Sequence, residues 1–77
     1  ISLHITLDAA DLSEADVLQA AERMQRLLNE AGYDYNGVVI NANLLEGEWG
    51  KDLGPLKYAV SFKRDTVIRL EDIERFD

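Results

Sequence analysis

The sequence predicts an α+β domain in which one long helix packs on one face of a small antiparallel or mixed sheet of three or four strands. Residues 13–32 repeat their apolar side chains at helical spacing, which indicates an amphipathic helix. Apolar and polar residues instead alternate in residues 1–7, 38–45 and 56–63, as they do in half-buried strands. The predicted order is β-α-β-β-(β)-α. We expect residues 1–77 to form a single domain.

The helix predicted for residues 13–32 has a recognisable start and end. Ser13 and Asp16 have the spacing of a capping box, with Asp in place of the usual Glu or Gln. Gly32 suits the left-handed position that ends a helix. The side chains expected to face the sheet are Val17, Ala20, Ala21, Met24, Leu27, Leu28 and Ala31.

The strands at residues 38–45 and 56–63 are expected to form an antiparallel hairpin. Residues 46–55, which connect them, hold three glycines and the only proline, and we expect them to be irregular. Residues 66–69 are expected to be either a short fourth strand or extended chain. Leu70, Ile73 and Phe76 then recur every three residues, which predicts a short C-terminal helix. The resulting arrangement resembles a truncated split βαβ unit.

The composition argues against several classes of function. The chain has no cysteine, so it offers neither a disulfide nor a thiolate, and we expect it in the reducing cytoplasm. No apolar stretch approaches the roughly 20 residues of a membrane span, so no membrane association is expected. The net charge of −7 opposes binding to nucleic acid and favours a basic partner.

His4 and the acidic residues at the start of the helix are the two candidates for a chemical site, and we interpret both as ordinary parts of the fold. His4 shares a strand face with Ser2 and Thr6, at about 6.5–7 Å, which is too far for the short hydrogen bond of a nucleophile and its base. The acidic series at the start of the helix lacks the pattern of a calcium loop, and we interpret it as helix capping. We therefore expect no catalytic activity, no cofactor and no metal site.

Residues 46–55 are the most informative segment for function. They lack the glycine patterns of phosphate-binding loops, but they contain Trp49, the only tryptophan. Tryptophan is enriched among the residues that dominate interface energies, although Trp49 could instead fold back and cap a small core. The predicted partner-binding residues are Trp49, Glu46, Glu48, Asp8, Asp11, Glu14 and Glu22.

The favoured hypothesis is a small acidic protein-interaction module without catalytic activity, which binds a protein partner through the acidic helix start and residues 46–55. A first alternative is an inhibitor of a nucleic-acid-binding enzyme encoded by a mobile element, acting as a DNA mimic or in an anti-CRISPR-like manner. The outer sheet face lacks aromatic side chains on which bases stack, so direct nucleic-acid binding is not expected. A second alternative is a homodimerising structural domain cut from a larger protein, because the chain begins with Ile1 rather than Met.

Overall fold

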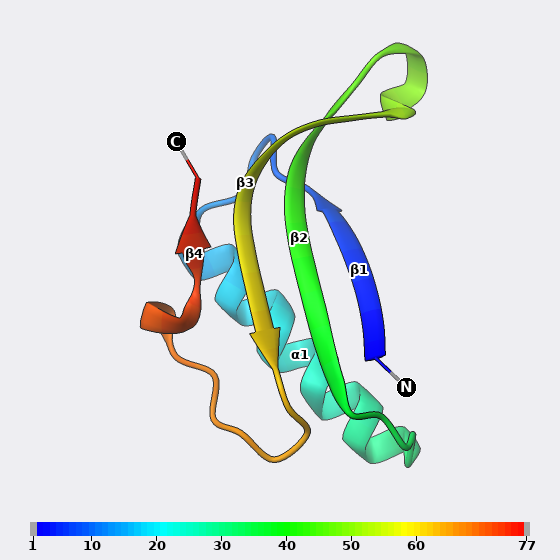
Figure 1. Ribbon diagram of the computed structural model, residues 1–77, viewed down its shortest axis with the longest axis vertical. Helices are drawn as coiled ribbons and strands as arrows, with labels where there is room; N and C mark the ends of the chain where they lie inside the picture. Colours follow the sequence, from blue (N-terminus) through cyan, green and yellow to red (C-terminus); the bar gives the residue numbers. More distant parts are fainter. Residues whose placement is uncertain (1, 77) are drawn as a thin grey trace.

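The computed structural model describes residues 2–76 and shows one helix lying on one face of a four-stranded sheet (Figure 1). The sheet order is β1-β2-β3-β4, with β1 and β2 parallel and the other neighbours antiparallel. The predicted α+β fold class is confirmed; Ile1 of the expected first strand lies outside the described residues. The elements are β1 (Ser2–Asp8), α1 (Glu14–Ala31), β2 (Gly37–Glu46), η1 (Glu48–Gly50), β3 (Asp52–Phe62), η2 (Leu70–Asp72) and β4 (Glu74–Arg75).

The ends of α1 are fixed by the residues that the sequence indicates. The Ser13 backbone N–H donates to the Asp16 carboxylate over 2.9 Å, and the Asp16 N–H donates to Ser13 Oγ over 3.3 Å. This reciprocal pair satisfies two backbone donors that the first turn would otherwise leave without partners. Gly32 ends the helix with φ of 74°, a left-handed conformation that costs glycine little.

Replacing Ser13 with alanine is expected to lower the free energy of unfolding by about 1 kcal/mol, because the Asp16 N–H loses its acceptor. Urea denaturation followed by circular dichroism measures this change. Ser61→Ala is a matched control on the exposed face of β3, where a change within about 0.5 kcal/mol is expected. Equal effects at the two serines would show that the cap does not stabilise the helix.

The core lies between α1 and the inner face of the sheet. Val17 and Ala21 of the helix are fully buried, and Met24 and Leu28 continue this stripe along the same side. Two residues expected in the stripe are exposed: Leu27 is at its edge and Ala31 is at the last helical position. The sheet contributes buried side chains from alternate positions, namely Val38, Ile40 and Ala42 of β2 with Val60 and Phe62 of β3.

The prediction that residues 46–55 are irregular is wrong for half of that segment. Strand β2 continues through Glu46 and β3 begins at Asp52, so only residues 47–51 form the turn. Strand β1 pairs with β2 only as far as Asn43, and β4 pairs with β3 only at Tyr58 and Ala59. Residues 44–56 therefore have no third strand beside them and form a two-stranded extension, which we call the arm. Figure 1 shows the arm continuing past the upper ends of β1 and β4.

The C-terminal segment forms one helical turn and a strand instead of the predicted short helix. Residues 66–69 contain no strand, η2 is a single 3-10 turn, and the fourth strand is β4. Ile73 is buried, but Leu70 and Phe76 remain exposed, so the spacing of these three residues does not form one buried helical face. The reason is tertiary: the Phe76 N–H donates to the Lys57 carbonyl over 2.9 Å, which draws this segment along the edge of β3.

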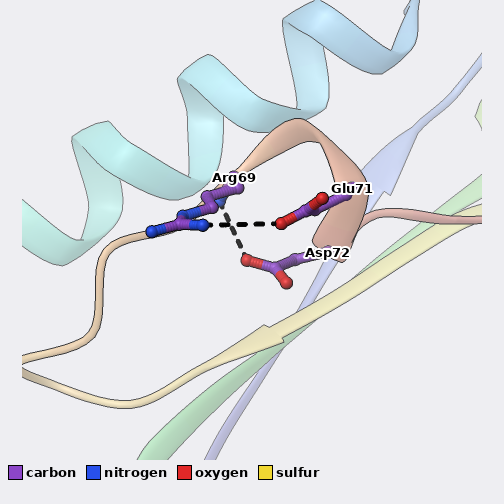
Figure 2. Close-up of polar contacts among 3 residues, drawn as sticks. All are labelled: Arg69, Glu71 and Asp72. Atoms are coloured by element: carbon purple, nitrogen blue, oxygen red, sulfur yellow. Dashed lines mark hydrogen bonds and ion pairs between the residues drawn. The ribbon is translucent and has the colours of Figure 1, made fainter.

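Side-chain hydrogen bonds hold the connection between β3 and β4. Figure 2 shows the η2 turn, where the Arg69 backbone N–H donates to the Asp72 carboxylate over 2.9 Å. The Arg69–Glu71 ion pair in the same view spans 3.7 Å between exposed side chains and contributes little to stability. The Gln25 amide of α1 donates to the carbonyls of Lys63 and Thr66, over 2.9 and 2.8 Å, and so fastens the loop to the helix.

Candidate interaction site on the arm

The base of the arm is held by a close approach of its two strands. Strand β3 carries one more residue than β2 at each of two register shifts, between Ala42 and Asn43 and between Asn43 and Leu45. The buried Asn43 amide donates to the Gly54 carbonyl over 3.1 Å. A Cβ atom at position 54 would overlap the Leu44 carbonyl oxygen, so only glycine fits there without a shift of the backbone.

Three residues at the tip of the arm have a positive φ. Gly47 and Gly50 have φ values of 82° and 63°, and a Cβ at position 47 would overlap the Asp52 carboxylate. Trp49 has φ of 65°, and no other non-glycine residue among residues 2–76 has a positive φ. Such a conformation costs on the order of 1–3 kcal/mol and persists only where the surrounding structure imposes it. The turn therefore holds Trp49 in place at an energetic cost.

Trp49 points into solvent with 85% of its surface exposed, so the interpretation that it folds back and caps the core is wrong. Leu53, which lies on β3 opposite Leu45, is 65% exposed on the same arm. Exposed apolar side chains gathered on one projecting segment are unusual, because burial of each would be favourable. The arm thus exposes two large apolar side chains apart from the core.

Acidic residues flank the exposed tryptophan in the sequence. Glu46 lies directly opposite Asp52 across the hairpin, which brings two like charges together, and Glu48 adds a third carboxylate in the turn. Lys51 is the one basic residue between positions 46 and 52. Like charges opposite each other destabilise a strand pair, so this charge pattern is a cost to the arm.

The other acidic residues predicted for the site lie in different parts of the structure, and only some of them are near the arm. Asp8 pairs with Asn43, the residue directly before the arm, and Asp11 follows on the exposed connection to α1. Glu14 is half-buried and forms an ion pair with Arg75 over 2.9 Å, so its charge is partly offset. Glu22 lies eight residues further along α1, about 12 Å from Glu14. It lines a pocket with Arg64 of the β3–η2 connection, so it does not belong to the arm surface.

A shallow groove of about 490 Å³ runs along the base of the arm. It lies between the hairpin and the C-terminal segment, and its lining joins apolar side chains to Arg75, which holds Glu14. No residue of the helix start lines the groove; Glu14 contacts it only through its ion pair with Arg75. Its lining residues are Leu44, Pro55, Leu56, Lys57, Tyr58, Arg75 and Phe76.

The open face of the sheet carries side chains that could support chemistry, but it keeps them apart. His4 pairs with Val39, and Val39 pairs with Ser61, so two strand spacings, about 9.6 Å, separate the histidine from the serine. That separation is too long for a nucleophile and its base. Within residues 2–76, no three His, Asp or Glu side chains gather as metal ligands. The one helix of the described segment is not apolar enough to cross a membrane.

Comparison with known proteins places the chain in a family. Residues 1–74 match the family described as the YfjL-like C-terminal domain. The chain belongs to this family. A curated relative from Bacillus subtilis (strain 168), described as the uncharacterized protein YfjL, is 35% identical over 74 residues. The match covers 96% of this chain but 31% of the relative, so the chain spans about a third of that protein's length. No solved structure matches the chain.

In this YfjL-like domain, two residues of the candidate site, one on the arm and one in the groove at its base, could not be predicted from the sequence. Leu53 falls inside a segment whose glycines and proline indicate a loop, and Phe76 falls inside a pattern that indicates a helix. One signal for Leu53 is present: Leu45 and Leu53 flank the turn residues almost symmetrically, as opposed residues of a hairpin do. No comparable signal marks Phe76.

Proposed function

We propose that this YfjL-like domain is a non-catalytic protein-interaction module that binds its partner through the arm. The observation that carries the proposal is Trp49, which is exposed at the end of a structured hairpin in a strained conformation. Strained, non-glycine positions concentrate at binding and catalytic sites, where function offsets their cost. The residues that engage the partner are Trp49, Glu46 and Glu48, joined by Leu53 and the groove at the arm's base.

The energy of the proposed contact comes mainly from Trp49 and Leu53. Burying a large apolar side chain stabilises a complex by roughly 1.5–3 kcal/mol, and tryptophan is among the residues that most often dominate an interface. The turn that carries Trp49 is already closed by the Gly50 N–H, which donates to the Gly47 carbonyl over 3.2 Å, so less conformational entropy is lost on binding.

The charge around the arm favours a basic partner. Three carboxylates and one lysine lie within three residues of Trp49 in the sequence. Asp8 and Asp11 lie beyond the base of the arm, and the whole chain carries −7. A basic surface would relieve the repulsion between Glu46 and Asp52 and would be attracted over several ångströms before contact. We place this interaction in the cytoplasm, because a chain without cysteine fits a reducing compartment.

Replacing Trp49 with alanine is expected to weaken partner binding at least about 30-fold, the effect of an interface residue worth about 2 kcal/mol. The stability of the free domain is expected to change by no more than about 0.5 kcal/mol, since Trp49 is exposed. Affinity capture with immobilised wild-type and Trp49→Ala domains identifies proteins that bind only the wild type, and titration with the purified partner gives the affinity.

Val67→Ala is the matched control, since Val67 is 73% exposed on the β3–η2 loop, outside the arm. It is expected to retain the partner. Trp49 is also the only tryptophan, so its fluorescence reports directly on the arm and is expected to shift to shorter wavelength on binding. A partner that binds the Trp49→Ala domain as tightly as the wild type would refute the proposal, and binding that is insensitive to salt would refute its electrostatic part.

A further inference from the structure

Strand β1 forms an edge of the sheet along its whole length. It pairs with β2 without interruption from Ser2 opposite Gly37 to Asp8 opposite Asn43, and Figure 1 shows no element beyond its other side. Leu3, Ile5 and Leu7 are only half-buried although they contribute to the core. The edge is therefore both unpaired and partly apolar.

The backbone groups that face this edge can be assigned. The Ala9 N–H donates to the Asn43 carbonyl over 2.8 Å, so position 9 faces β2. Because backbone groups alternate in direction along a strand, the N–H and C=O groups of Leu3, Ile5 and Leu7 also point toward β2. The N–H and C=O groups of Ser2, His4, Thr6 and Asp8 face outward, and within residues 2–76 no other element pairs with them.

The two sides of the sheet differ in how they are protected. On the β4 side, the edge consists of a two-residue strand with charged residues, and β3 beyond it carries two bulges and Pro55. Such features discourage strand pairing. Strand β1 has no lysine, no proline and no bulge. Since proteins generally block edges that must stay free, β1 is suited to pairing with another strand.

We infer that the β1 edge pairs antiparallel with β1 of a second copy, forming a symmetric dimer with a continuous eight-stranded sheet. The sequence of β1, SLHITLD, has a pattern that is symmetric about Ile5. In the register centred there, Ile5 meets the partner's Ile5 and Leu3 meets the partner's Leu7, so apolar residues face one another. His4 and Thr6 meet on the opposite face, and their outward backbone groups form the hydrogen bonds.

Charge also favours a second copy at this edge. Two chains that each carry −7 repel one another, so they can associate most readily where each is least charged. Strand β1 contains one carboxylate, Asp8, which lies opposite the partner's Ser2 in this register. The same surface on both copies makes the contact isologous, which closes the dimer at two chains and leaves the arms free.

Replacing Thr6 with proline tests this interface. It removes an outward N–H at two symmetry-related places in the dimer but does not disturb the bonds between β1 and β2. Multi-angle light scattering across the micromolar range is expected to give twice the 8.7 kDa chain mass for the wild type. The Thr6→Pro chain is expected to dissociate at least about tenfold more readily and to keep a cooperative thermal transition.

Thr6→Val is the matched control, because it retains the backbone N–H and is expected to remain a dimer. His4→Lys provides a second disruptive variant, should the proline prevent folding; it places a charge on each strand of the interface and is expected to weaken the dimer. A wild-type chain that stays monomeric, or folded Thr6→Pro and His4→Lys chains that remain dimeric, would overturn the inference. Trp49→Ala is expected to leave the dimer intact, which separates this interface from the arm.

Discussion

Replacing Ile40 with alanine is expected to lower the free energy of unfolding by about 3 kcal/mol. Ile40 is almost fully buried in β2, where it pairs with Ile5 on one side and Val60 on the other, with α1 above it. A chain of 77 residues is stable by roughly 4–12 kcal/mol, so this single cavity removes a large share of the total. Urea denaturation followed by circular dichroism gives the change directly.

Val39→Ala is the natural control, since Val39 is the next residue of β2 and lies on the open face of the sheet. It is expected to cost no more than about 1 kcal/mol, mainly through lost strand propensity. If the two substitutions destabilised the domain equally, the sheet would be buried on both faces, contrary to the arrangement of one helix on one face. The comparison therefore tests the architecture as well as the residue.

The parts of the fold that could be predicted are those determined by short-range chemistry. The capping pair of Ser13 and Asp16 and the left-handed Gly32 lie within a few residues of the backbone groups that they satisfy, so the sequence alone indicates where α1 begins and ends. The strands follow from alternation, because one buried face imposes a period of two. These local signals agree with one another, as expected for a sequence that specifies one fold.

The parts that could not be predicted depend on distant residues. Ile73 and Phe76 lie beside β3 because Phe76 pairs with Lys57, a contact that helical spacing cannot reveal. The arm likewise depends on Asn43 reaching Gly54 across two register shifts, whereas its glycines taken alone indicate a loop. The candidate site shows the same division: Trp49 and its acidic neighbours could be predicted from composition, but the exposure of Leu53 and the separation of Glu22 could not.

Replacing Gly54 with alanine is expected to open the arm while leaving the core folded. The new Cβ overlaps the Leu44 carbonyl oxygen and crowds the Glu46 side chain, and relief requires the two strands to move apart. Overpacking of this kind costs about 1–3 kcal/mol, and here the cost falls on a two-stranded extension that has little other support. Amide hydrogen exchange at Leu45 and Leu53 is expected to accelerate about tenfold or more, and partner binding is expected to fall although Trp49 is unchanged.

Gly32→Ala is the matched control for this prediction. A Cβ at position 32 meets no atom within 4 Å, so its cost arises only from the φ of 74° and is about 1–2 kcal/mol, located at the end of α1. It is expected to leave exchange at Leu45 and Leu53 and partner binding at wild-type levels. If Gly54→Ala accelerated exchange in the arm but left partner binding unchanged, a rigid arm would not be required, and Trp49 would act from a flexible loop. Loss of binding together with faster exchange would instead show that the domain recognises its partner through a preorganised hairpin, because the tryptophan itself is present in both chains.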